Sequence, residues 1–138
     1  MTDHEAGPRT VRFYAEAFIK RPGMYLGRPI RIDRALPFLR GYEAALFDVR
    51  LATHDLGNVH LPAGPVAQFE TQLSAEGRLR WHSLELTLAA EAIGWTQQDP
   101  PVLDELTEEQ HHAAISLLLP LVEQLFALPD TLVTPERS

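Results

Sequence analysis

Apolar side chains recur at helical spacing near the start of the chain. Between Thr10 and Ile19 they form one stripe, as residues three and four apart do on an α-helix: Val11, Tyr14, Ala15 and Phe18. The dipeptide Pro22-Gly23 predicts the end of this helix, because the residue before proline avoids the helical region. A loop is then expected over Met24–Ile32.

The same spacing predicts two further helices. Asp33 is a suitable N-cap for a helix that runs to about Val49, with Pro37 in its first turn, where a missing N–H costs little. A long loop is expected over residues 53–65, which contain two prolines and two glycines. The next helix is predicted over Val66–Ala75 and is closed by Gly77.

Residues 78–82 fit two structures. Their alternation of apolar and polar side chains resembles a short strand or hairpin, whereas the spacing from Trp81 onward favours a helix. We predict a helix over Ser83–Ile93, with Gly94 as its C-terminal cap, and leave residues 78–82 open. A Pro-Pro linker is expected over Gln97–Asp104.

The last helix is predicted from Thr107 to Phe126. Gln110 lies three residues after Thr107, the spacing of a capping box, and two glutamates lie in the first turn, where they favour the positive end of the helix dipole. Leucines on several sides of this helix indicate burial on more than one face, and Pro120 predicts a kink.

Composition supports a mostly helical chain. Leu and Ala number 37 of the 138 residues, against 12 for Val and Ile, and the first pair favours helices. We therefore expect an all-α, single-domain bundle of four or five helices, with frayed ends at about residues 1–8 and 131–138. The predicted core is led by these residues: Leu36, Leu39, Phe47, Trp81, Leu88, Leu118, Leu121 and Leu125.

Several functional classes lack their sequence signatures. The chain has no cysteine, no apolar run of membrane-spanning length and no apolar signal core, so a cytoplasmic protein is expected. It also lacks a nucleophile elbow, a phosphate-binding Gly-Lys loop and a dinucleotide fingerprint. We predict a protein without enzymatic activity and without a cofactor.

A metal site is not expected either. The run Glu108–His112 has the Glu-x-x-His spacing of helical di-iron sites, but such sites need a second motif and two more glutamates. No pair of histidines has His-x-x-x-His spacing. The run is therefore interpreted as an acidic, solvated first turn.

The segment Lys20–Gly27, KRPGMYLG, is unusual. It resembles the KRPGMYIG stretch in the ATPase domain of DNA gyrase B and related type II topoisomerases, and the resemblance implies that Glu43 matches their catalytic glutamate. Phe47 stands where that family has a magnesium-binding asparagine, Asp55-Leu56-Gly57 comes too soon after Glu43, and no glycine-rich lid follows. ATP hydrolysis is therefore not expected.

A second resemblance covers residues 10–50. Small bacterial proteins share an Arg-Pro-Gly-Met-Tyr-Leu-Gly loop followed by a helix with Phe-x-x-Gly-Tyr, which here is Phe38–Tyr42. Some of them look like immunity or accessory proteins. The residues of the loop themselves allow a purely structural interpretation, in which Gly23 and Gly27 permit the turn and Met24, Tyr25 and Leu26 plug the gap between the first two helices without a ligand.

The same loop supports a second interpretation. Four arginines surround it, and free backbone N–H groups with arginines favour an anion: Arg21, Arg28, Arg31 and Arg34. The candidate nucleotide- or phosphate-binding residues are Arg21, Gly23, Tyr25 and Arg28.

Charge is distributed unevenly. Residues 1–50 carry a balance of +3 and residues 51–138 one of −10, so the two parts can attract each other, or the second can attract a basic protein. Nucleic acid is not an expected partner, whereas self-association through the Leu-rich last helix is a second use. The candidate partner-binding residues are Asp99, Asp104, Glu105, Glu108 and Glu109.

Overall fold

The computed structural model of the protein describes residues 10–53 and 64–128, without the side chains of residues 49–53. This part is all-α, as the sequence predicts, and contains no strand; residues 78–82, which the sequence left open, form neither a strand nor a hairpin. The predicted frayed ends and most of the 53–65 loop lie outside the described residues. The elements are α1 (Val11–Lys20), α2 (Gly23–Leu26), α3 (Ile32–Thr53), α4 (Pro65–Ala75), α5 (Leu84–Ile93), a 3-10 turn η2 (Leu103–Glu105), α6 (Glu108–Ser116) and α7 (Leu119–Phe126).

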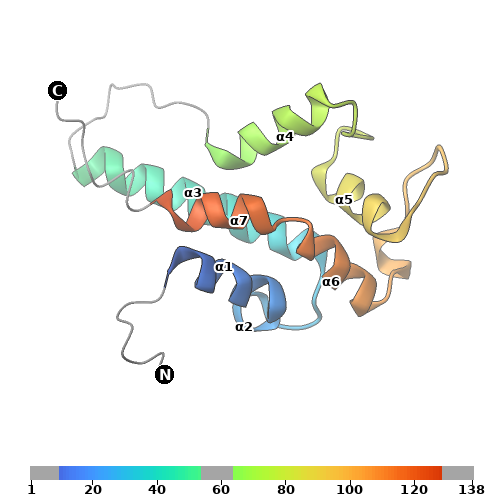
Figure 1. Ribbon diagram of the computed structural model, residues 1–138, viewed down its shortest axis with the longest axis horizontal. Helices are drawn as coiled ribbons and strands as arrows, with labels where there is room; N and C mark the ends of the chain where they lie inside the picture. Colours follow the sequence, from blue (N-terminus) through green and yellow to red (C-terminus); the bar gives the residue numbers. More distant parts are fainter. Residues whose placement is uncertain (1–9, 54–63, 129–138) are drawn as a thin grey trace.

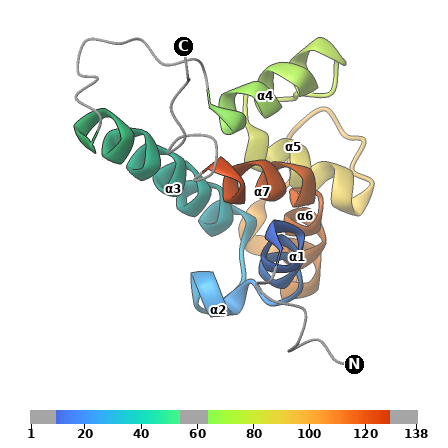
Figure 2. The same cartoon turned by 60° about the vertical axis from the view of Figure 1, so that its left-hand side comes forward.

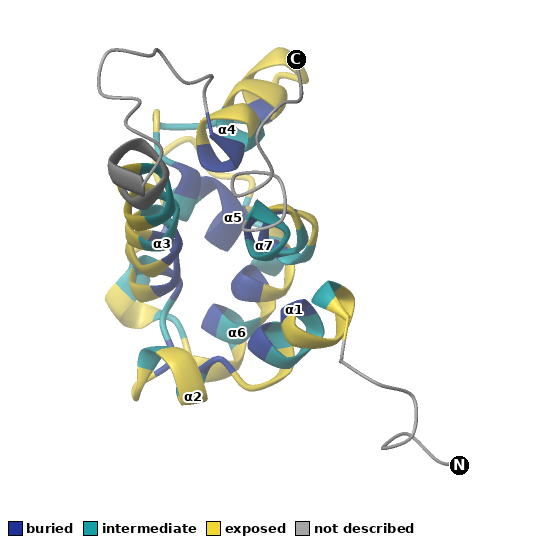
Figure 3. Cartoon of the chain, turned by 90° about the vertical axis from the view of Figure 1, so that its left-hand side faces the viewer, coloured by how far each residue is buried: buried dark blue, intermediate teal, exposed yellow. Residues whose placement is uncertain are grey.

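The helices enclose one core between α3 and the last two helices. Helix α1 lies alongside α7 and also contacts α6, while α5 packs against α6 (Figure 1). Helix α3 contacts α4, α5, α6 and α7, and its far end projects away from α1 and α6 (Figure 2). The short α2 contacts the start of α3. Buried residues face inward from the other α-helices, whereas α2 has none, and the outer sides of α1 and α2 are exposed (Figure 3).

Most of the predicted core is confirmed. Six of the eight residues are almost completely buried: Leu36, Leu39, Leu88, Leu118, Leu121 and Leu125. Phe47 and Trp81 are only partly buried, so their prediction as core residues is wrong. Phe47 lies more than one turn beyond Tyr42, on the projecting part of α3. Trp81 lies in a turn, where Arg80 covers its ring and its indole N–H donates to the Gln98 carbonyl.

Helix α1 begins at Val11, next to the predicted start at Thr10, which is its N-cap. The Thr10 hydroxyl accepts a hydrogen bond from the Phe13 N–H at 3.1 Å, which satisfies one free donor of the first turn. Ala15 and Phe18 from the predicted stripe are buried, but Tyr14 is 44% exposed. The face of α1 that packs on the core is therefore narrower than the sequence pattern indicates.

The start of α3 differs from the prediction. The helix begins at Ile32, so Asp33 lies inside its first turn, where its carboxylate binds the Arg31 guanidinium at 2.9 and 3.0 Å. Pro37 lies inside the helix rather than in its first turn. The segment before α3, which the sequence predicts as a loop, contains the short helix α2.

The last predicted helix is two helices. The capping box of Thr107 and Gln110 is present, but the helix ends at Ser116 and α7 starts at Leu119. Pro120 has no backbone N–H, so a continuous helix would lose a hydrogen bond there, and the chain breaks rather than kinks. This break and the additional α2 account for seven α-helices in the described part, where four or five were predicted.

Both ends of α5 follow the prediction. Ser83 accepts a hydrogen bond from the Leu86 N–H, and Gly94 adopts the left-handed conformation at φ 69°. The helix is preceded by a turn in which Trp81 and His82 have φ values of 53° and 49°. This turn occupies the segment that the sequence left open.

Candidate functional site

The unusual loop links α1, α2 and α3 at one end of the bundle. Pro22 and Ile30 are buried and anchor it, and Gly27 reverses the chain after α2 at φ 76°, a conformation that favours glycine. The Arg34 guanidinium donates to the Pro29 carbonyl at 3.2 Å. The loop is therefore held by its own apolar residues and by the first turns of α3.

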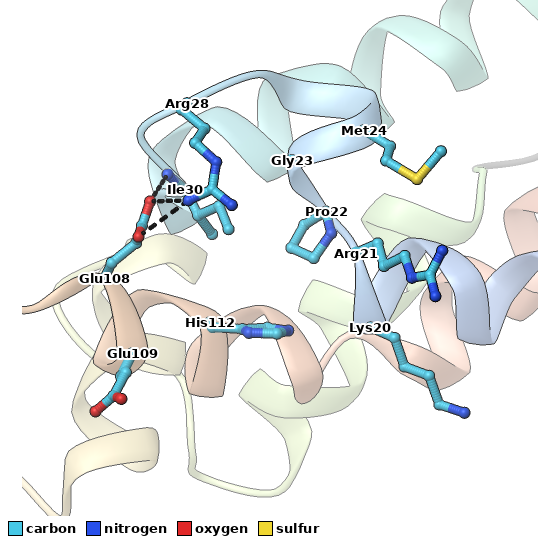
Figure 4. Close-up of a pocket in the computed structure, with 10 residues that line it drawn as sticks. All are labelled: Lys20, Arg21, Pro22, Gly23, Met24, Arg28, Ile30, Glu108, Glu109 and His112. Atoms are coloured by element: carbon cyan, nitrogen blue, oxygen red, sulfur yellow. Dashed lines mark hydrogen bonds and ion pairs between the residues drawn. The ribbon is translucent and has the colours of Figure 1, made fainter.

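A cavity of about 560 Å³ opens beside this loop (Figure 4). Three of the four predicted ligand-binding residues line it, namely Arg21, Gly23 and Arg28, whereas Tyr25 does not. The cavity is also lined by α6, at the residues Glu108, Glu109 and His112. The fold thus brings the predicted ligand loop against two of the predicted partner-binding carboxylates.

The ion-paired and the unpaired cations of this cavity lie on opposite sides of it. Arg28 is paired with Glu108 at 3.3 Å, and Glu108 also accepts the Ile30 N–H at 2.9 Å. No described carboxylate lies within 4 Å of Lys20 or Arg21, which extend on the opposite side of the cavity (Figure 4). Of the three cationic side chains that line the cavity, Lys20 and Arg21 are therefore the two that can bind a ligand without breaking an ion pair of the described chain.

Two carboxylates of the predicted acidic surface form ion pairs within the chain. Asp104 binds Arg31 at 2.8 Å, just as Glu108 binds Arg28. The other three carboxylates, of Asp99, Glu105 and Glu109, are exposed and have no ion pair among the described residues. Two of the five predicted residues therefore have intramolecular partners that the sequence did not reveal.

A second cavity, of about 410 Å³, lies between α1 and α2. We call it the α1–α2 groove, and its lining is Phe13, Tyr14, Glu16, Ala17, Lys20, Arg21, Met24 and Tyr25. Met24 is 75% exposed, and Tyr14 and Tyr25 are 44% and 38% exposed. An apolar, aromatic surface of this kind was missed at the sequence level, because Tyr14 and Met24 were assigned to packing.

The plug interpretation of the loop is correct for Leu26 and wrong for Met24. Leu26 packs against the core, while Met24 faces solvent. The Tyr25 ring is half exposed, with its centroid 5.2 Å from that of Phe18 and 6.3 Å from that of Phe38. Tyr25 therefore covers the edge of the core and also presents one side to the groove.

The two adjacent histidines have structural partners. His111 is buried, accepts the Ile32 N–H at Nδ1 (3.1 Å) and donates from Nε2 to the Leu103 carbonyl (3.0 Å). His112 places Nε2 2.6 Å from the Ile19 carbonyl. The solvated-turn interpretation is therefore wrong for His111. Nowhere in residues 10–53 and 64–128 do three or more His, Asp or Glu residues gather as a metal site would require.

Glu43, the position that the gyrase resemblance matches to a catalytic glutamate, caps another helix. Its carboxylate accepts the Val66 N–H at 3.1 Å, at the start of α4. Comparison with protein families, curated proteins and solved structures finds no match to this chain. None of the described helices is long and apolar enough to cross a membrane.

Proposed function

We propose that the protein is a non-enzymatic, cytoplasmic module that binds another protein through the α1–α2 groove. The observation that carries this proposal is the exposure of Met24, at 75%, beside two half-exposed tyrosines in a hollow surface. Exposed apolar side chains that share a concave site mark protein-binding surfaces, and methionine adapts to varied partners. Tyrosine supplies large contact area at low entropic cost.

The groove supports this function better than the acidic residues do. Asp104 and Glu108 already bind arginines of the same chain, so a partner would have to compete for them. Asp99, Glu105 and Glu109 remain as a secondary surface for a basic partner, whose association would weaken with salt. Met24 of the groove faces solvent and offers its surface without such competition.

The test is an affinity capture from the native host with the wild-type chain and two matched variants. Met24→Glu places a charge in the groove, and Val102→Glu places one on another exposed apolar residue, which is 54% exposed. We expect a specific protein that co-purifies with the wild type and V102E but not with M24E. Capture of the same proteins by all three chains, or of none by any, would contradict the proposal.

A second candidate function is binding of a phosphate-bearing ligand in the cavity beside the loop. Its support is the placement of Lys20, Arg21 and Arg28 around one space of about 560 Å³, a size suited to a small ligand. Binding would raise the melting temperature, because a ligand that binds only the folded state stabilises it. The test is a thermal-shift panel of ATP, ADP, GTP and inorganic phosphate, with and without magnesium.

The arginine variants make this panel specific. Arg21→Ala and Arg28→Ala should abolish a shift that arises in the cavity, whereas Arg78→Ala, at an exposed arginine that neither lines the cavity nor contacts the loop, should keep it. No shift with any phosphate compound would reject this second function.

Self-association through the last helix receives no support from the packing. Four apolar residues of this region are buried in the chain's own core: Leu118, Leu121, Val122 and Leu125. Leu117, in the connection between α6 and α7, is 38% exposed. The buried leucines that suggested a dimer interface therefore pack inside the chain and are not available to a second copy.

A further inference from the structure

We infer that the partner segment bound in the α1–α2 groove is an amphipathic helix that carries carboxylates beside its apolar face. This inference rests on the proposed function and adds the chemistry of the partner. It follows from the shape of the groove, from its apolar lining and from the charges at one end.

The shape comes from α1. On the α1 side the groove is lined by Phe13, Tyr14, Glu16, Ala17 and Lys20, and Arg21 follows as the C-cap of the helix. The spacing of Phe13, Tyr14, Ala17 and Lys20 describes a single stripe that rises by about 10 Å at 1.5 Å per residue. Such a stripe is straight and long enough to lie beside about two turns of a second helix, which is the geometry of helix-in-groove recognition.

The apolar surface runs along the stripe. Tyr14 offers exposed surface near its start, and Met24, whose N–H donates to the Arg21 carbonyl, offers exposed surface near its end. Ala17 has a small side chain that allows a close approach. An apolar side chain of the partner that leaves water here is stabilised in proportion to the apolar area that it buries. Apolar residues at positions i, i+3 or i+4, and i+7 of a partner helix would fit this surface.

The charged part lies at the loop end of the stripe, beside Met24. Among the groove residues Glu16 has a carboxylate, and Arg12 binds it at 2.7 Å while also binding Glu123 at 2.8 Å. The hydrogen bond from Arg12 holds the pKa of Glu16 below its ordinary value, so this carboxylate stays ionised and paired. Lys20 and Arg21, in contrast, have no carboxylate within 4 Å in the described chain. The charge of Lys20 also contributes to the lowered pKa of Glu16, but Glu16 is already paired with Arg12, so the groove carries net positive charge where it meets the loop.

This charge selects the occupant. A carboxylate of the partner gains from Lys20 and Arg21, whereas a basic segment would be repelled. A second copy of this chain in a two-fold contact would bring the same patch to both sides, with its cations and with the Glu16 carboxylate already paired to Arg12, so it offers no free carboxylate to match them. An acidic, amphipathic helix of a different protein meets both the apolar and the charged part.

The experiment is a selection from a phage-displayed library of random peptides of about 14 residues, which is enough for four helical turns. Enriched peptides are synthesised, and their binding to the whole chain is measured by fluorescence anisotropy at low and high salt. The matched variants are M24E, the double variant K20E/R21E and the control V102E. Thermal melts monitored by circular dichroism verify that each variant folds.

We expect enriched peptides with apolar residues at helical spacing and with Asp or Glu at one end. Their affinity should fall at least about tenfold in K20E/R21E, a loss of about 1.4 kcal/mol, and should weaken with salt; it should be lost in M24E and unchanged in V102E. Groove-dependent peptides that are basic or neutral, or that bind K20E/R21E equally well, would overturn the inference and leave protein binding intact. If no enriched peptide depends on Met24, the inference and the proposed function both fail.

Discussion

At the scale of single residues, His111 joins two parts of the chain that are far apart in sequence. Its buried ring accepts the Ile32 N–H and donates to the Leu103 carbonyl, so it satisfies the first turn of α3 and the η2 turn together. The ring must be neutral, with its proton on Nε2, to make both bonds. Sequence spacing alone placed His111 in a solvated turn, because the burial of one of two adjacent histidines depends on what α3 brings against it.

His111→Phe is expected to destabilise the protein by about 2–4 kcal/mol. The phenyl ring keeps most of the volume but leaves a buried donor and a buried acceptor without partners, each of which costs about 1–3 kcal/mol. Urea unfolding followed by circular dichroism measures the change, and the exposed His82→Phe is the control. Equal unfolding midpoints for H111F and the wild type would show that these two hydrogen bonds carry no stability.

The turn before α5 offers a stabilising substitution. Trp81 and His82 both have positive φ values, which cost L-residues roughly 1–2 kcal/mol each. His82 is exposed and has no hydrogen bond among the described residues, so His82→Gly should raise the free energy of unfolding by up to about 1 kcal/mol, after the entropy of glycine is subtracted.

Trp81→Gly is the matched comparison. It removes the same strain but also the hydrogen bond to Gln98 at 2.8 Å and the ring beneath Arg80, whose guanidinium carbon lies 4.0 Å from the ring centroid. We expect W81G to lower the melting temperature while H82G raises it. A lower melting temperature for H82G would show that the left-handed turn is not strained.

At the scale of elements, α4 depends on a cap from another helix. Gly64 is its N-cap and has no side chain to offer, and the Glu43 carboxylate of α3 accepts the Val66 N–H instead. A Cβ atom at Gly64 would collide with that same carboxylate, although the backbone there is extended and accepts any residue. The absence of a side chain at Gly64 is what admits Glu43.

Glu43→Ala and Gly64→Ala should therefore have the same effect. Each removes the cap and should cost about 1 kcal/mol, and the double variant should cost little more than either single one. Urea unfolding of the four chains completes the thermodynamic cycle. Additive losses would mean that Gly64→Ala acts by some other route than displacement of Glu43.

The helix boundaries show which features of the fold are determined by residues close in sequence. The ends of α1, α5 and α6 follow from caps at Thr10, Ser83 and Thr107, because a capping side chain lies next to the helix that it starts. Asp33 was wrongly predicted as a cap because Arg31, two residues away, binds its carboxylate. The groove depends on tertiary structure, since Tyr14 and Met24 belong to different helices and share a surface only once the loop turns back.

At the scale of the whole molecule, the uneven charge is partly used internally. Arginines of the first 50 residues bind carboxylates of the remainder in these pairs: Arg12–Glu123, Arg28–Glu108, Arg31–Asp104, Arg40–Glu70 and Arg40–Glu85. The net charges of +3 for residues 1–50 and −10 for residues 51–138 are compatible both with attraction between the two parts and with a basic partner. The charge balance alone therefore could not decide between these two interpretations. Most of these side chains are partly exposed, so each pair contributes at most about 1 kcal/mol.

Stability should fall at both extremes of pH. Hydrogen bonds from Arg31 hold the pKa of Asp33 below its ordinary value, and burial raises the pKa of the Tyr42 hydroxyl. A lowered carboxyl pKa stabilises the folded state above the unfolded value, about 4, and this contribution is lost as the pH falls through the folded pKa. A raised tyrosine pKa acts in the opposite direction, and its contribution is lost as the pH rises beyond about 10.

Two variants separate these ends of the profile. Asp33→Asn should flatten the acid decline, and Tyr42→Phe should flatten the alkaline decline, because each removes the titrating group and leaves the other end unchanged. The measurement is the free energy of unfolding in urea at intervals from pH 3 to about pH 11, with buffers of matched ionic strength. An acid decline that is as steep in D33N as in the wild type would assign it to other carboxylates with lowered pKa values, of which Glu16 and Glu76 are the next to test.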